Sequence, residues 1–136
     1  MKLLIDANIL LDVLAKREGY FKDSLLVWKL CEAGYTSGIV SALSVADIIY
    51  VLRKRLNAEK TEELIKKLRM IFEFADLSGQ ELVSAASLKW NDYEDAVQYV
   101  TAKRLGADFI ISRNIRDFSG SGIPAFTPEE FLDRYW

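Results

Sequence analysis

The stretch that decides the fold is LLIDANILLDVL, which runs from Leu3 to Leu14. Its first three residues are apolar and predict a short buried strand that stops at Asp6. From Asn8 to about Lys16 the apolar residues recur at helical spacing, so a helix follows the strand directly. A strand that passes into a helix, with no hairpin turn, is typical of α/β folds with parallel strands.

The same alternation continues along the chain. Further helices are expected over 21–33, 42–56, 58–72, 79–88, 93–105 and from 128 onward, and strands over 35–40, 72–77, 108–111 and 123–126. No Asn-Gly or Asp-Gly turn joins two strands. These patterns predict a single domain over residues 1–136, an α/β sandwich with a mainly parallel central sheet. Ligands of such folds bind beyond the carboxyl ends of the strands.

The composition is that of a folded domain, with 136 residues, 51% of them hydrophobic and 28% charged. No apolar run approaches the roughly 20 residues that a membrane span requires. The single cysteine, Cys31, has no partner for an internal disulfide. We therefore expect a soluble cytoplasmic protein that does not enter a membrane.

Histidine is absent from the chain. This excludes Ser-His-Asp and Cys-His catalysis and every zinc site that needs a histidine ligand. Hydrolytic chemistry would have to use carboxylates, amides, hydroxyls or lysine. An oxygen-ligated hard cation such as Mg²⁺ or Mn²⁺ is the natural companion of such groups.

Basic side chains are concentrated in one segment. Residues 53–69 carry seven basic and three acidic side chains, whereas the whole chain has a net charge of −2. The segment is compatible with a solvated amphipathic helix, or with a surface that meets a phosphate backbone.

Carboxylates follow two of the predicted strands. Asp6 comes directly after the first strand, and Asn114 and Asp117 come within a few residues of the strand at 108–111. Each has a local alternative, as a helix N-cap or as part of a polar loop.

Two predicted helices supply further acids. Asp47 lies among apolar residues, so it should be paired, for example with Arg55, or bind a cation. Asp92 and Asp95 lie near a helix start, where the helix dipole favours acids. We expect Asp95 to point inward and Glu94 to point away. Three or four carboxylates gathered at one sheet edge would repel one another, and a divalent cation would remove that penalty.

Four segments resemble the PIN-domain ribonucleases, a family that includes VapC-like toxins. They are LIDANILL (4–11), SVADIIYVLR (44–53), DYEDA (92–96) and ADFIISRNIRDF (107–118). The resemblance implies a three-layer α/β/α sandwich and Mg²⁺- or Mn²⁺-dependent hydrolysis of RNA phosphodiester bonds. It also implies a homodimer controlled by an antitoxin protein.

The resemblance assigns roles to individual residues. Asp6, Asp95 and Asp117 would be catalytic and hold the metal, with Asn114 as a secondary ligand; Asp47 would complete the catalytic set, at a position where the family more often has Glu; Asn8, Ser112 and Asp92 would support the site; and Lys54, Arg55 and Arg113 would contact the RNA backbone.

The sequence leaves two alternative functions open. The chain could be a catalytically weak or inactive PIN-like module that acts through protein–protein binding. A phosphatase with Asp6 as nucleophile would need a second Asp two positions on, where Asn8 stands.

Overall fold

Five parallel strands form the centre of the molecule. In the computed structural model, which describes all 136 residues, the strand order is β3-β2-β1-β4-β5 and every neighbouring pair is parallel. The strands are β1 (Lys2–Ile5), β2 (Ser37–Ser41), β3 (Phe72–Ala75), β4 (Phe109–Ile111) and β5 (Ala125–Phe126). The predicted α/β/α architecture and its parallel sheet are confirmed.

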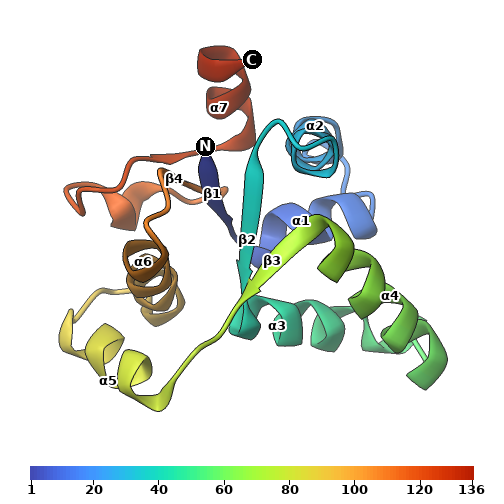
Figure 1. The fold of residues 1–136 in the computed structure, drawn as a ribbon, viewed down its shortest axis with the longest axis horizontal. Helices are drawn as coiled ribbons and strands as arrows, with labels where there is room; N and C mark the ends of the chain where they lie inside the picture. The colour runs from blue at the N-terminus through green and yellow to red at the C-terminus, as the bar shows by residue number, and fades with distance from the viewer.

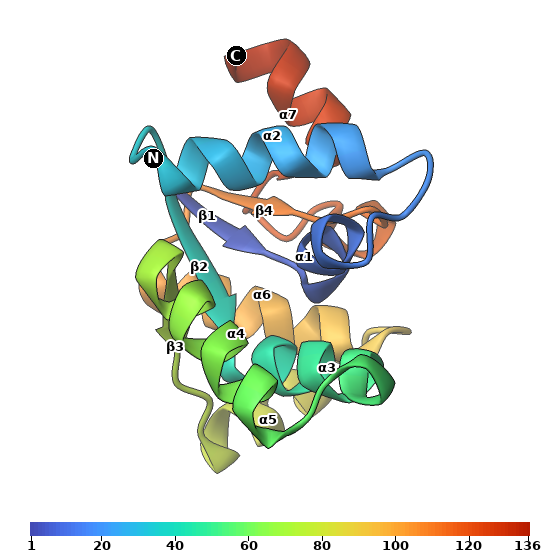
Figure 2. The same ribbon diagram turned by 90° about the vertical axis from the view of Figure 1, so that its right-hand side faces the viewer.

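Seven helices cover the two faces of this sheet (Figures 1 and 2). They are α1 (Ala7–Leu14), α2 (Phe21–Glu32), α3 (Ala42–Leu52), α4 (Ala58–Ile71), α5 (Gly79–Ser87), α6 (Tyr93–Leu105) and α7 (Pro128–Tyr135). Two short 3₁₀ turns, η1 (Arg53–Arg55) and η2 (Arg116–Phe118), complete the chain. None of the helices combines the length and the apolar composition needed to cross a membrane.

Alternating side chains of β1 divide the core into two layers. Leu3 and Ile5 pack with α1, α2, α3, α4 and α7 in the larger cluster, whereas Leu4 packs with α6 on the opposite face. Helix α5 packs on α6 through a small third cluster around Ala85 and Val97. The three apolar side chains of β1 are fully buried, which explains why a continuous apolar run rather than an alternating one marks this strand.

Side-chain caps mark the N-termini of α3, α4, α5, α6 and α7. Helix α6 begins after Asp92, whose Oδ1 accepts a hydrogen bond from the Asp95 N–H over 3.1 Å, and ends at Gly106 in the left-handed conformation. The expected helix over 42–56 is shorter than predicted, because α3 ends at Leu52 and a 3₁₀ turn replaces its last residues. The segment 116–118, expected as loop, forms the 3₁₀ turn η2.

Candidate metal centre

The carboxyl ends of β1 and β4 bring the first two candidate residues together. Ile5 pairs with Ile111 in the sheet, so Asp6 and Ser112 follow side by side. The Ser112 hydroxyl lies 3.4 Å from Asp6 Oδ2 and donates to it. Gln98 of α6 donates to Asp6 Oδ1 over 3.3 Å and to the Ser44 hydroxyl of α3 over 2.9 Å. The Asp6 carboxylate is thus held by Ser112, directly after β4, and by Gln98 on α6.

Three other carboxylates converge at the start of α6. Asp92, Asp95 and Asp117 each place a carboxylate oxygen within 4.8 Å of the other two. Asp95 is the most enclosed of the three, with only 8% of its surface exposed. Its Oδ2 atom is buried and has no hydrogen-bond partner. The expectation that Asp95 points inward is confirmed.

Burial and like charges disfavour the ionised form of Asp95. Burial, and after it the neighbouring charges of Asp92, Asp6 and Asp117, together raise the pKa of Asp95 to about 7. Burial also raises the pKa of Asp6, against the opposing effect of its hydrogen bonds. A carboxylate whose ionised form is disfavoured by like charges is stabilised when a cation binds. The all-oxygen donor set and the unpartnered Asp95 oxygen fit a hard divalent ion.

A pocket of about 450 Å³ opens over Asp6, Asp92 and Asp95, whereas Asp117 lies outside its lining. It is lined by Asp6, Asn8, Tyr20, Asp92, Glu94, Asp95, Ser112, Arg113 and Asn114. The expectation that Glu94 points away was wrong, because Glu94 lines the pocket. Burial raises the pKa of Glu94, and the charges of Asp47, Asp92 and Asp6 raise it further. The pocket rim therefore takes in the exposed first turn of α6 as well as its inner face.

The remaining predicted residues lie at different distances from this centre. Asp47, on α3, is half-buried and close enough to raise the pKa of Glu94, but it does not line the pocket. No ion pair joins Asp47 to Arg55, the alternative partner. Lys54 and Arg55 lie exposed in η1, beyond the end of α3 and outside the pocket lining.

Three residues at or beside the site were not predicted from the sequence. Gln98 lies one helical turn beyond Asp95, a spacing that places both on one face of α6 and could have revealed it. Asp12, fully buried on α1, interrupts the apolar run ILLDVL and could have been found by the reasoning applied to Asp47. Tyr20 gave no sequence signal of its own, since it precedes α2 in an irregular connection.

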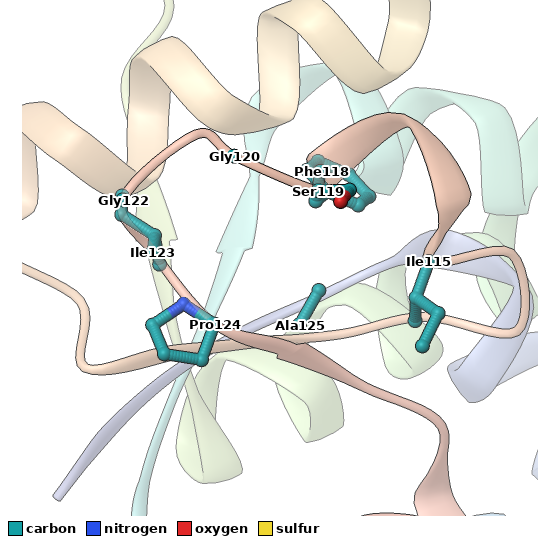
Figure 3. A pocket seen from close by; sticks show the side chains of 8 residues that line it. All are labelled: Ile115, Phe118, Ser119, Gly120, Gly122, Ile123, Pro124 and Ala125. Carbon is teal, nitrogen blue, oxygen red and sulfur yellow. The ribbon is translucent and has the colours of Figure 1, made fainter.

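A second hollow of about 400 Å³ lies between η2 and β5 (Figure 3). Its lining consists of Ile115, Phe118, Ser119, Gly120, Gly122, Ile123, Pro124 and Ala125. None of these side chains titrates or ligates metals strongly. The candidate site residues therefore lie outside this hollow.

The chain is thus an α/β/α protein with a parallel sheet and a carboxylate-lined pocket at the carboxyl ends of its strands. Residues 2–116 match the PIN domain family, so the chain belongs to that family. Ribonuclease VapC1 of Aquifex aeolicus (strain VF5) is 29% identical to this chain over 139 residues, covering 98% of this chain and 95% of the relative.

Solved structures agree on the fold. A toxin–antitoxin complex from Klebsiella pneumoniae contains a chain with a TM-score of 0.70 at 21% identity, covering 93% of this chain and 97% of the other. VapC20 of Mycobacterium tuberculosis, described as a sarcin-ricin loop cleaving toxin, has a TM-score of 0.69 at 12% identity, with 89% and 95% coverage. VapBC2 of Rickettsia felis, bound to a promoter DNA fragment, has a TM-score of 0.65 at 16% identity, with 93% and 98% coverage.

Proposed function

We propose that this chain is a divalent-cation-dependent endoribonuclease and the toxin of a toxin–antitoxin pair, with residues 1–136 forming a single PIN-like domain. The observation that carries the proposal is the group of carboxylates within 4.8 Å of one another at Asp92, Asp95 and Asp117. Family membership and the ribonuclease relative support the reaction class.

The metal would be Mg²⁺ or Mn²⁺, held by Asp6, Asp95 and Asp117, with Asn114 as a secondary ligand. Asp92, whose carboxylate lies within 4.8 Å of those of Asp95 and Asp117, would join these two in addition to capping α6. Such an ion supplies an activated water and neutralises charge on the phosphate during in-line displacement.

The other residues would hold these carboxylates and the substrate. Gln98 and Ser112 fix the orientation of Asp6 through hydrogen bonds. Asp47 would complete the catalytic set from α3. Its side chain is one methylene shorter than the Glu that the family more often has, which favours action through water over direct ligation.

Contacts to RNA would come from basic side chains. Arg113 lines the acidic pocket itself, and a guanidinium can donate two parallel hydrogen bonds to a phosphate. Lys54 and Arg55, exposed in η1, would meet the backbone farther along the strand. These contacts would position the RNA without selecting its sequence.

The partner would be an antitoxin protein, and the chain would form a homodimer. Structural neighbours that are described as toxin–antitoxin complexes support the first part of this proposal. A catalytically weak module that acts by protein binding is the competing function, favoured by Asp47 in place of Glu.

Cleavage of RNA tests the proposal. The wild-type chain should cleave a single-stranded RNA pool with Mn²⁺ or Mg²⁺ and lose this activity in EDTA. Asp6→Asn should abolish cleavage while the circular dichroism spectrum stays unchanged, and the exposed Asp133→Asn serves as the control. Absence of cleavage in the wild type, with no recovery in Asp47→Glu, would favour the binding module.

A further inference from the structure

A buried carboxylate lies behind the acidic pocket. Asp12 of α1 is fully buried, and Ser24 of α2 donates a hydrogen bond to its Oδ2 over 2.9 Å. Its other oxygen, Oδ1, lies 3.2 Å from Arg113 Nη2 and 3.7 Å from Arg17 Nη1. One carboxylate thus faces two guanidinium groups, and the cluster keeps a net positive charge.

Arg113 connects this cluster to the pocket. It is the only basic side chain in the pocket lining. Its guanidinium carbon lies 4.2 Å from the centre of the Tyr20 ring, and its buried Nε has no hydrogen-bond partner. Arg113 therefore keeps one donor, its Nε, for which the protein supplies no acceptor.

Arg113 lines the same pocket as four carboxylates. A long cationic side chain beside Asp6, Asp92, Glu94 and Asp95 would be expected to pair with one of them. No such ion pair forms, and the only carboxylate within ion-pair distance of Arg113 is Asp12. A buried ion pair is weak evidence for a stabilising role, because apolar side chains of similar volume often stabilise a core equally well.

We propose that Asp12 is a positioning residue, which together with Tyr20 holds the Arg113 guanidinium away from the pocket carboxylates. The carboxylates are thereby left free for a divalent cation, and the guanidinium is left free for a phosphate group of the substrate. The proposal rests on the proposed function for the identity of these two ligands. Asp12 is fully buried, so it would itself contact neither ligand.

Removal of the Asp12 charge should release Arg113 toward the pocket. In Asp12→Asn, the affinity for Mn²⁺ measured by calorimetry should fall about fivefold, the effect of one competing exposed ion pair. Adding Arg113→Ala should restore the Mn²⁺ affinity, because the competing cation is gone. A purely structural role of Asp12 would give no such rescue. Exposed Asp133→Asn and Arg134→Ala on α7 are the matched controls.

Tyr20→Leu provides a variant that leaves the buried pair intact. Since Tyr20 is half exposed, the fold should survive, and the Mn²⁺ affinity should fall in the same direction as in Asp12→Asn. Unchanged Mn²⁺ affinity in both variants, or a loss that Arg113→Ala does not rescue, overturns the proposal.

RNA binding without metal separates this proposal from the nuclease itself. Anisotropy of a labelled single-stranded RNA in EDTA should report binding about tenfold weaker in both Asp12→Asn and Arg113→Ala. The double variant should bind no more weakly than either single variant. If the wild type binds RNA but neither cleaves it nor binds Mn²⁺, the proposed function fails. The RNA affinities of the wild type, the two single variants and the double variant then still decide the role of Asp12. Equal RNA binding in wild type and Asp12→Asn overturns that role.

Discussion

The side-chain amide of Gln98 donates to Asp6 across 92 residues of sequence, over 3.3 Å. The same amide nitrogen donates to Ser44, so a single side chain on α6 connects the end of β1 with the start of α3. A carboxylate held in this way loses little freedom when a cation binds. Positioning by neighbouring donors is a common determinant of metal affinity.

Gln98→Met keeps the volume of the side chain and removes both hydrogen bonds. We expect the Mn²⁺ affinity to fall by roughly tenfold or more, the usual effect of losing a partner of a metal ligand. Calorimetric titration measures the change. The exposed Gln80→Met on α5 is the control, and equal affinities in the two variants would show that Gln98 does not orient Asp6.

The raised pKa of Asp95 predicts how stability without metal depends on pH. The pKa rises from 3.8 to about 7 on folding, chiefly through burial and then through Asp92, Asp6 and Asp117. The folded state therefore binds the proton more tightly than the unfolded state does. The associated stability is complete below about pH 4 and is lost as the pH rises through about 7.

Denaturant unfolding in EDTA tests this dependence. The wild type should lose free energy of unfolding between pH 5 and pH 8, and Asp95→Asn should lose much less. Asp6 and Glu94, whose pKa values are also raised, should leave Asp95→Asn with a smaller slope of the same sign. Parallel pH profiles of wild type and Asp95→Asn would show that Asp95 ionises normally.

Mn²⁺ should reverse this trend, because only the ionised carboxylates bind it. Its stabilisation of the wild type, measured as the shift in melting temperature, should grow from pH 5 to pH 8. The Asp133→Asn control should behave as wild type. A shift that is the same at both pH values would mean that the ion binds elsewhere.

Asp47→Glu tests whether the Asp47 side chain on α3, one methylene shorter than Glu, limits RNA cleavage. The added methylene should extend the carboxylate toward Glu94 and the pocket, and increase the rate of Mn²⁺-dependent RNA cleavage several-fold. Asp76→Glu, at an exposed position, is the control for lengthening a carboxylate side chain by one methylene. A rate equal to that of the wild type would mean that Asp47 takes no part in cleavage.

Lys54→Ala/Arg55→Ala tests the basic turn η1. RNA affinity should fall, and the slope of log Kd against log salt should decrease by roughly one to two, as expected when two phosphate contacts are lost. Anisotropy at several salt concentrations provides both values. Lys29→Ala/Arg134→Ala removes the same charge from α2 and α7, and an identical effect there would indicate a response to net charge alone.

The sequence was sufficient for elements with clear end signals. Helix α6 has the predicted bounds, because Asp92 caps its start and Gly106 ends it with φ of 66°. The strand expected over 123–126 is only Ala125–Phe126, since hydropathy alone does not show where sheet pairing begins. Turn η2 had no periodic pattern that could distinguish it from a loop.

The site was predictable where topology dictates proximity. Parallel strand ends bring Asp6 beside Ser112, as the alternation of strands and helices implies. Contacts between side chains of different layers, such as Asp12 with Arg113, depend on how α1 packs against the segment that follows β4. Residue spacing carries no information on such contacts, so the ion pair became visible only in the folded chain.

The most direct measurement is anomalous diffraction at the manganese edge, from crystals grown with Mn²⁺ at a concentration that supports RNA cleavage. The account predicts a peak coordinated by oxygen atoms of Asp6, Asp95 and Asp117, and no peak in Asp95→Asn crystals. An anomalous peak elsewhere on the molecule would contradict this metal site. So would an empty site in crystals of a protein sample that cleaves RNA at full activity under the same Mn²⁺ concentration.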